Sequence, residues 1–130
     1  MTGRRPARWW RATRAAGIPM IDVLAGAVTA TDAGALLAML RPDVVTLVDD
    51  GGREARSRDA LRGADAAARE LRIALAGRKL RRVSINGDPG LVALAGERAV
   101  ATVCASERGG RIAELWIVRD PAKLANWDRH

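Results

Sequence analysis

The first third of the chain repeats apolar residues at helical spacing. The segment 20–30 predicts a helix because its apolar residues recur three or four positions apart, and Pro19 suits the first turn. The apolar positions of this segment are Ile21, Leu24 and Val28. Asp32 is a good N-cap for a second helix over ALLAML, which we expect to end near Pro42.

After Pro42 the pattern changes to that of a strand. The run 43–48 is apolar and β-branched, which favours a strand. Asp50-Gly51-Gly52 is typical of a tight hairpin turn, with the returning strand at 53–57. The Ala-rich segment 64–77 returns to helical spacing and predicts a third helix, with Gly77 as its C-cap.

Strand-like runs fill the rest of the chain. Turn-rich connections join them into an antiparallel meander, and Pro121 opens a last short helix. The runs are 80–86, 90–95, 98–106 and 111–118. Helices segregated from one sheet predict an α+β fold, in which a curved antiparallel sheet packs against about three helices. A strongly bent sheet of this kind encloses a cone-shaped cavity, a common ligand site.

Composition narrows the chemistry. The only histidine is His130, so a Ser-His-Asp triad and a His-rich metal site are excluded, and we expect no metal and no cofactor. Cys104 is the only cysteine, which fits a reducing cytoplasm, and its apolar neighbours indicate a core residue. No apolar run approaches the ~18 residues of a membrane span, so we expect a cytoplasmic protein without membrane contact.

The positive charge is concentrated at the start of the chain. The net charge is +7, but residues 1–18 hold five arginines and no acid, and the remainder has 17 basic against 15 acidic residues. We therefore divide the chain into a basic arm, 1–18, and one domain, 19–130. The arm is either a solubilising or linker remnant, or a contact for nucleic acid or an acidic partner. The arginines between 53 and 82 are interleaved with acids, as on a solvated face.

Three motifs, in order, carry a resemblance to a known family. They read PDVVTLVDDGGR at 42–53, INGDPGLVAL at 85–94 and IVRDPAKL at 117–124. Over residues 19–127 the chain resembles the SnoaL-like, nuclear-transport-factor-two-like cone fold. The closer resemblance is to the SnoaL-like C-terminal extension of SigJ-type extracytoplasmic-function (ECF) sigma factors. The sequence departs from that pattern at Asp50, Asp120 and Ala122.

The resemblance implies a function in transcription. In that family the extension sits against the sigma core and tunes its activity through the glycine loop and the terminal motif. The corresponding contact residues are Asp49, Gly51, Gly52, Arg53, Asp120, Pro121, Lys123 and Leu124. The DNA-binding sigma domains have no counterpart in this sequence, so we expect a stand-alone regulatory module. Its expected partner is a sigma factor or an RNA polymerase component.

Two other readings of the sequence stay open. The cone could bind a small apolar ligand, or act as an isomerase or hydrolase of the ketosteroid-isomerase-like class through a pocket carboxylate such as Glu114 or Asp49. The candidate pocket residues are Asp43, Asn86, Thr102, Glu114 and Trp116. The DDGG stretch itself is open to three readings: a turn, a protein-contact loop and a catalytic pair. By analogy with the fold class, we expect a homodimer.

Overall fold

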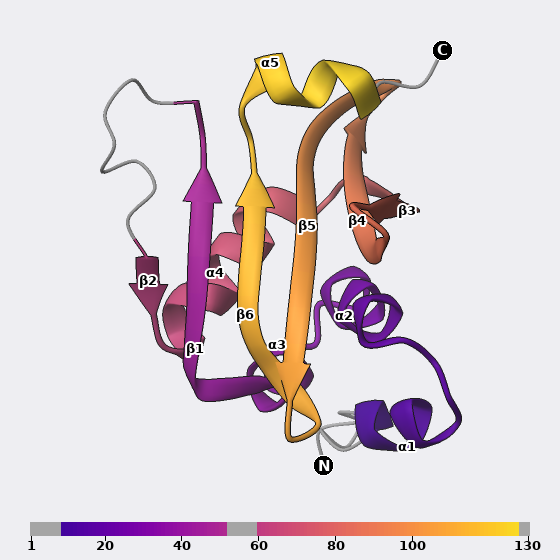
Figure 1. The fold of residues 1–130 in the computed structure, drawn as a ribbon. Helices are drawn as coiled ribbons and strands as arrows, with labels where there is room; N and C mark the ends of the chain where they lie inside the picture. Colours follow the sequence, from indigo (N-terminus) through magenta and orange to yellow (C-terminus); the bar gives the residue numbers. More distant parts are fainter. Residues whose placement is uncertain (1–8, 52–59, 128–130) are drawn as a thin grey trace.

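A computed structural model describes residues 9–51 and 60–127 of the chain. Its helices are α1 (Trp9–Ala15), α2 (Met20–Thr29), α3 (Ala33–Ala38), α4 (Ala64–Leu75) and α5 (Pro121–Leu124), followed by the 3₁₀ turn η2 (Ala125–Trp127). Its strands are β1 (Leu40–Asp49), β2 (Ala60–Arg62), β3 (Lys79–Ile85), β4 (Asp88–Ala95), β5 (Arg98–Arg108) and β6 (Arg111–Val118). Figure 1 shows the strands in one curved layer.

The strands form one mixed sheet in the order β2-β1-β6-β5-β4-β3. The predicted meander is confirmed, because β3 to β6 pair antiparallel with their sequence neighbours. The sheet is not antiparallel throughout, since β1 pairs parallel with β6, with Leu47 opposite Trp116. The last strand of the chain therefore lies inside the sheet, and it joins the early strand pair to the meander.

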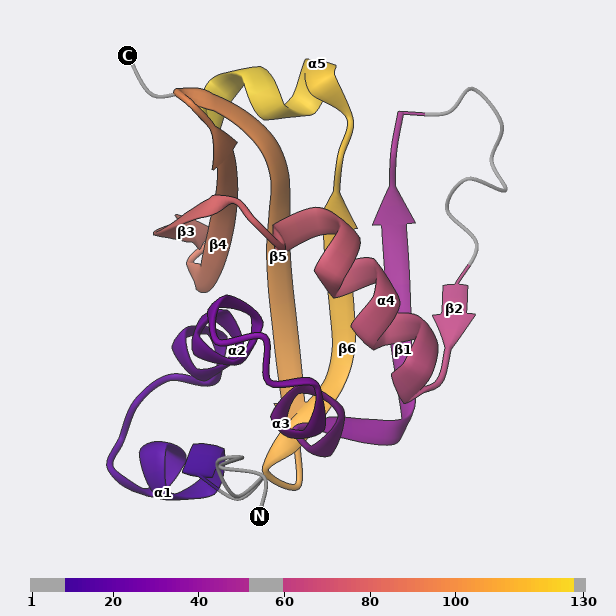
Figure 2. The ribbon, with the colours of Figure 1, turned by 180° about the vertical axis from the view of Figure 1, so that it is seen from behind.

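The helices α2, α3 and α4 cover one face of the sheet, as the view from behind shows (Figure 2). The side chains of β6 alternate accordingly: Leu115 and Ile117 are buried in the core beneath the helices, while Glu114 and Trp116 point to the open face. Small side chains such as Ala67, fully buried on α4, let that helix lie close to β1. The α+β prediction is confirmed.

The boundary between the second helix and the first strand differs from the prediction. Asp32 is the N-cap as predicted, and its carboxylate accepts a hydrogen bond from the Ala35 N–H at 3.0 Å. The helix ends at Ala38, and β1 begins at Leu40, before Pro42. Pro42 lies in a bulge of β1, where the pairing with β6 shifts register between Leu40 and Val45. A bulge tolerates a proline, which has no N–H to donate to the ladder.

The prediction of a tight hairpin directly after β1 was wrong. The described antiparallel partner of β1 is β2, which places Leu47 opposite Ala60, so the two strands are not joined by a short turn at Asp50-Gly51-Gly52. The predicted returning strand at 53–57 lies outside the described residues. Gly51 does have the positive φ of +81° that the turn chemistry indicated.

The described part of the predicted arm is packed against the domain. Trp10 of α1 is only 3% exposed and belongs to the main core cluster. The Trp9 indole N–H donates to Asp32 at 2.7 Å, and Arg14 forms an ion pair with Glu107 at 2.7 Å. Residues 9–15 are therefore part of the packed structure.

Candidate protein-contact surface

The end of β1 and the start of α5 are tied together through Asp49. The Asp49 carboxylate accepts hydrogen bonds from the Lys123 ammonium and from the Gly51 N–H, the second at 3.2 Å. The Asp49 carbonyl oxygen accepts from the Arg119 N–H at 2.7 Å. The DDGG stretch and the terminal motif, 70 residues apart in sequence between Asp49 and Arg119, thus form one surface.

Gly51 lies directly against Asp120. A Cβ atom added at Gly51 would stand 2.8 Å from Asp120 Oδ1 and 2.9 Å from its Cγ, so only glycine fits without a shift. Asp120 is the N-cap of α5, and its Oδ1 accepts from the Ala122 N–H at 3.0 Å. Asp and Asn are both good N-caps, so the departure from asparagine at Asp120 keeps this local structure.

Among the implied contact residues of the terminal motif, one is buried and anchors α5, and two are exposed. Leu124, which the resemblance implied as a contact residue, is 3% exposed and packs in a second core cluster with Val92 and Leu94. It therefore fixes α5 to the sheet and is not available to a partner. Pro121 and Lys123 are exposed. Gly52 and Arg53 lie outside the described residues.

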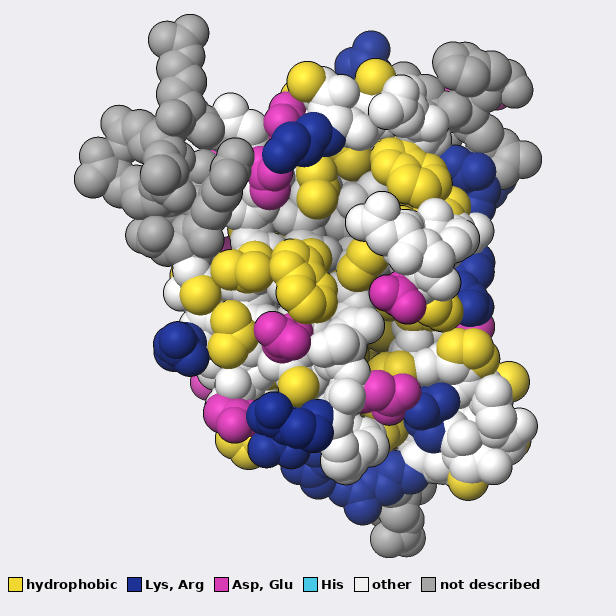
Figure 3. Space-filling model, viewed as in Figure 1, with side chains coloured by type: hydrophobic (Ala, Val, Ile, Leu, Met, Phe, Trp, Pro, Cys, Tyr) yellow, Lys and Arg dark blue, Asp and Glu magenta, His cyan; other side chains and the backbone are white. Residues whose placement is uncertain are grey.

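A shallow groove of about 290 Å³ adjoins this surface on the open face of the sheet. It is lined by Leu47, Trp116 and Val118, with Asp49 and Lys123 at its end. Trp116 is 40% exposed. Figure 3 shows hydrophobic side chains gathered in the middle of this face, with acidic and basic side chains above them.

We call this area the β1–α5 surface, defined by a short set of residues: Leu47, Asp49, Gly51, Trp116, Val118, Asp120, Pro121 and Lys123. It combines a half-exposed aromatic and apolar centre with a charged edge, the composition that distinguishes the centre of protein interfaces from their rim. The sequence pattern had predicted Leu47 only as part of a buried strand. The parallel β1–β6 pairing places it beside Trp116 on the open face.

The five candidate pocket residues are not brought together. Asp43 is exposed in the β1 bulge, and Asn86 is exposed in the turn before β4. Thr102 is 5% exposed and pairs with residues of β4 and β6. Glu114 and Trp116 lie on the open face, away from the helices that cover the concave side. Core side chains fill that concave side.

The carboxylates among them do not have the environment of a general base. The Arg41 side chain donates to Asp43 at 3.0 Å, and this hydrogen bond holds the pKa of Asp43 below its ordinary value. Glu114 is exposed and accepts from the Ser106 hydroxyl at 3.3 Å. A carboxylate that acts as a base near neutral pH lies in a site that excludes water, whereas Asp43 and Glu114 are both exposed to solvent.

Two further observations concern the described ranges 9–51 and 60–127. No group of three or more His, Cys, Asp or Glu side chains there is placed to hold a metal ion. No helix in those ranges is long and apolar enough to cross a membrane.

The sequence matches no protein-family model and no curated protein. Solved structures do match. The extracytoplasmic function sigma factor SigJ of Mycobacterium tuberculosis is 24% identical, with a TM-score of 0.54 over 87% of this chain. The match covers 47% of the SigJ chain, so this chain spans about half of that protein's length.

Two bacterial proteins assigned to enzyme classes also have structures similar to that of this chain. One is assigned as a polyketide cyclase of Xanthomonas campestris pv. campestris: it is 16% identical, with a TM-score of 0.54 over 88% of this chain and 96% of its own. The other is assigned as a ketosteroid isomerase of Kribbella flavida: it is 11% identical, with a TM-score of 0.53 over 73% of this chain and 70% of its own. At these identities the similarity shows a shared architecture, which different functions use. The chain therefore has the nuclear-transport-factor-two-like, SnoaL-like fold, with an α+β cone built on a curved mixed sheet.

Proposed function

We propose that this chain is a regulatory interaction domain that binds a sigma factor or an RNA polymerase component through the β1–α5 surface. The observation that carries the proposal is the contact between the DDGG stretch and the terminal motif, made by the Asp49–Lys123 ion pair and by Gly51 against Asp120. These are two of the three segments through which the chain resembles the sigma-factor extension, and the two to which the resemblance assigns the contact. The SigJ likeness supports the same fold.

The chemistry of the surface fits a protein partner. Burying a half-exposed indole such as Trp116 gives a large apolar contribution, and tryptophan is over-represented among residues that dominate binding energy. Asp49 and Lys123 are positioned at the edge, where charges select a partner and orient it. No specific observation favours the enzyme reading, because the candidate carboxylates lie on the solvent-exposed side of the strands.

Affinity capture from the native host tests this function. The full chain, bearing a tag, would be compared with Trp116→Ala and with Lys123→Gln, and bound proteins would be identified by mass spectrometry. Lys79 is exposed on β3, away from the β1–α5 surface, and is the other lysine of the chain, so Lys79→Gln is the matched control. We expect a sigma factor or polymerase subunit with the unmodified chain and with the control.

Recovery should fall about tenfold or more for Trp116→Ala, because truncating such a residue at the centre of an interface typically costs about 2 kcal/mol or more. Capture of the same subunit by all variants would place the contact elsewhere. Capture of no transcription protein by any of them would refute the proposed function. If Trp116→Ala instead converts a dimer of this chain to monomer in sedimentation, the surface pairs two copies of the chain.

A further inference from the structure

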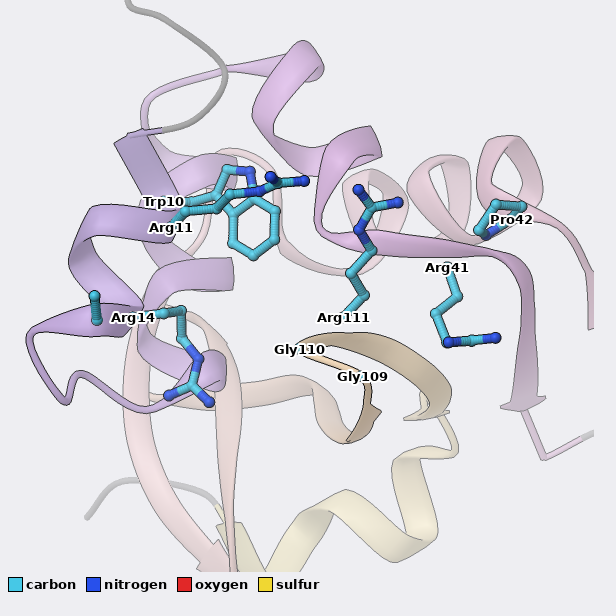
Figure 4. A pocket seen from close by; sticks show the side chains of 9 residues that line it. Trp10, Arg11, Arg14, Arg41, Pro42, Gly109, Gly110 and Arg111 are labelled. Atoms are coloured by element: carbon cyan, nitrogen blue, oxygen red, sulfur yellow. The ribbon is translucent and has the colours of Figure 1, made fainter.

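A groove of about 690 Å³ lies at the end of the molecule opposite the β1–α5 surface, beside α1. Figure 4 shows its lining: two arginines from α1, one from the β1 bulge and one from the start of β6. These are Arg11, Arg14, Arg41 and Arg111. Among residues 9–51 and 60–127, no acidic residue lines the groove. Basic side chains also gather along this lower end in the space-filling view (Figure 3).

Only some of this charge is neutralised. Glu107 pairs with Arg14 at 2.7 Å, and Asp43 pairs with Arg41 at 3.0 Å. Within residues 9–51 and 60–127, neither Arg11 nor Arg111 has a carboxylate partner; Arg11 lies over the Trp10 ring at 5.3 Å, and Figure 4 shows Arg111 reaching into the space between the α1 arginines and the β1 bulge. The groove therefore keeps at least two unpaired guanidinium groups.

The fold builds this arrangement from the bulge and from a glycine turn. The register shift in β1 swings Arg41 and Pro42 out of the ladder and into the groove wall. The β5–β6 turn contributes Gly109 and Gly110, both at positive φ, and a Cβ added at Gly110 would meet no atom within 4 Å. A ligand backbone can thus approach the turn closely at Gly110, while at Gly109 the nearest side-chain atom is Arg41 Nη1, 3.5 Å from where a Cβ would lie.

We propose that this groove binds the phosphodiester backbone of a nucleic acid. Guanidinium groups suit phosphate oxygens because their planar donors pair with two oxygens at once. Trp10, the aromatic residue of the described lining, is 3% exposed and cannot stack on a base, so recognition is through phosphates and is not specific for sequence. The inference does not rest on the proposed function, since it uses a separate surface.

The lining favours a nucleic acid over an acidic protein segment. A protein interface needs an apolar or aromatic anchor that the partner can bury, and the groove presents guanidinium groups and glycines around a tryptophan that is already buried. Phosphate binding needs no such anchor, because positive charge supplies most of the non-specific affinity. The sequence adds Arg4, Arg5 and Arg8, with no acid among residues 1–8, directly before α1.

Fluorescence anisotropy of the full chain with labelled DNA tests the groove. The probes are a single strand and a duplex of about 20 nucleotides or base pairs, titrated at several salt concentrations. The groove variant is Arg11→Gln/Arg111→Gln. The matched control is Arg69→Gln/Arg72→Gln, which removes two exposed arginines from α4 and has the same net charge as the groove variant.

We expect the groove variant to lower the slope of log K against log salt by about 2, or about 1 for each arginine. The corresponding rise in Kd is about 50-fold at 0.1 M salt, and the control should stay within about twofold. Arg11→Lys/Arg111→Lys should restore most of the affinity, because it keeps the charge. Urea unfolding of the glutamine variant, followed by tryptophan fluorescence, checks separately that it is folded.

Other results would overturn the proposal. Equal weakening by the groove and control variants would indicate attraction to the overall charge. Loss of binding in Arg4→Gln/Arg5→Gln/Arg8→Gln, with the groove variant unaffected, would assign the contact to residues 1–8. Poly-glutamate binding as tightly as DNA, with the same dependence on Arg11 and Arg111, would assign the groove to an acidic protein segment. Absence of binding to both the single strand and the duplex at low salt would refute the proposal.

Discussion

Replacing Gly51 with alanine measures how tightly the DDGG stretch and α5 are joined. Two separate effects oppose the alanine. The first is the backbone: φ is +81°, and a non-glycine residue in this region is disfavoured by about 1–2 kcal/mol. The second is crowding, because the new Cβ would stand 2.8 Å from Asp120 Oδ1. If Asp120 moves away, α5 loses the N-cap hydrogen bond to Ala122, worth about 1 kcal/mol. We expect a total loss of about 2–3 kcal/mol.

A second glycine isolates the crowding. Gly77 has a similar φ of +72°, and a Cβ added there would meet nothing within 4 Å, so Gly77→Ala should lose only the backbone part, about 1–2 kcal/mol. Urea unfolding followed by tryptophan fluorescence gives both free energies of unfolding. In a double-mutant cycle, Gly51→Ala/Asp120→Ala should be about 1 kcal/mol more stable than the sum of the single losses, because the side chain that the Cβ meets is gone. Equal losses at Gly51 and Gly77, with no coupling to Asp120, would refute this account of the surface.

Three further predictions concern single buried or paired groups. Thr46 is fully buried, and its hydroxyl has no hydrogen-bond partner in the described structure. Thr46→Val should therefore raise the free energy of unfolding, measured in urea, by about 1 kcal/mol. A lower free energy of unfolding in this variant would contradict the burial of an unpaired hydroxyl. The pKa of Asp43 is lowered by Arg41, so the pair adds stability above the usual carboxyl pKa of about 4 and loses it as pH falls below; in an NMR titration, Arg41→Gln should raise the pKa of Asp43. Burial, with a smaller contribution from Asp88, raises the pKa of the Cys104 thiol. Its reaction with a disulfide reagent at pH 8 should therefore be several-fold slower in the folded chain than in urea. Equal rates would contradict the burial of this thiol.

Local chemistry in the sequence predicted local structure well. The N-cap at Asp32, the helix over 64–77 and the meander from 80 to 118 follow from capping, spacing and turn residues that act within a few positions. Non-local pairing was not accessible in the same way. Nothing near Leu47 indicates that it pairs with Trp116, nearly 70 residues later, so neither the parallel step in the sheet nor the apolar groove was predicted.

Of the two candidate surfaces, one was expected from sequence motifs and the other was not. The motifs at 42–53 and 117–124 were expected to share a surface by resemblance, and the structure joins them through Asp49 and Lys123. The arginine groove was missed because its lining comes from α1, the β1 bulge and β6, which only the folded chain assembles. The sequence held one signal: Pro42 stands directly before the run 43–48 that predicts a strand, and a proline is tolerated at the first residue of a strand or at a bulge, which turns neighbouring side chains such as Arg41 outward.

The place of β6 in the sheet has a consequence for how the protein is made. While the ribosome is still adding residues 111–118, β1 has no neighbour on the side that β6 will occupy, and the edge of β5 is also unpaired. The parallel pairing of β1 with β6 closes a long loop, and such contacts form slowly. Two unpaired strand edges are open to pairing with other chains during that interval. Synthesis that stalls just before β6 should therefore leave a nascent chain that depends on chaperones.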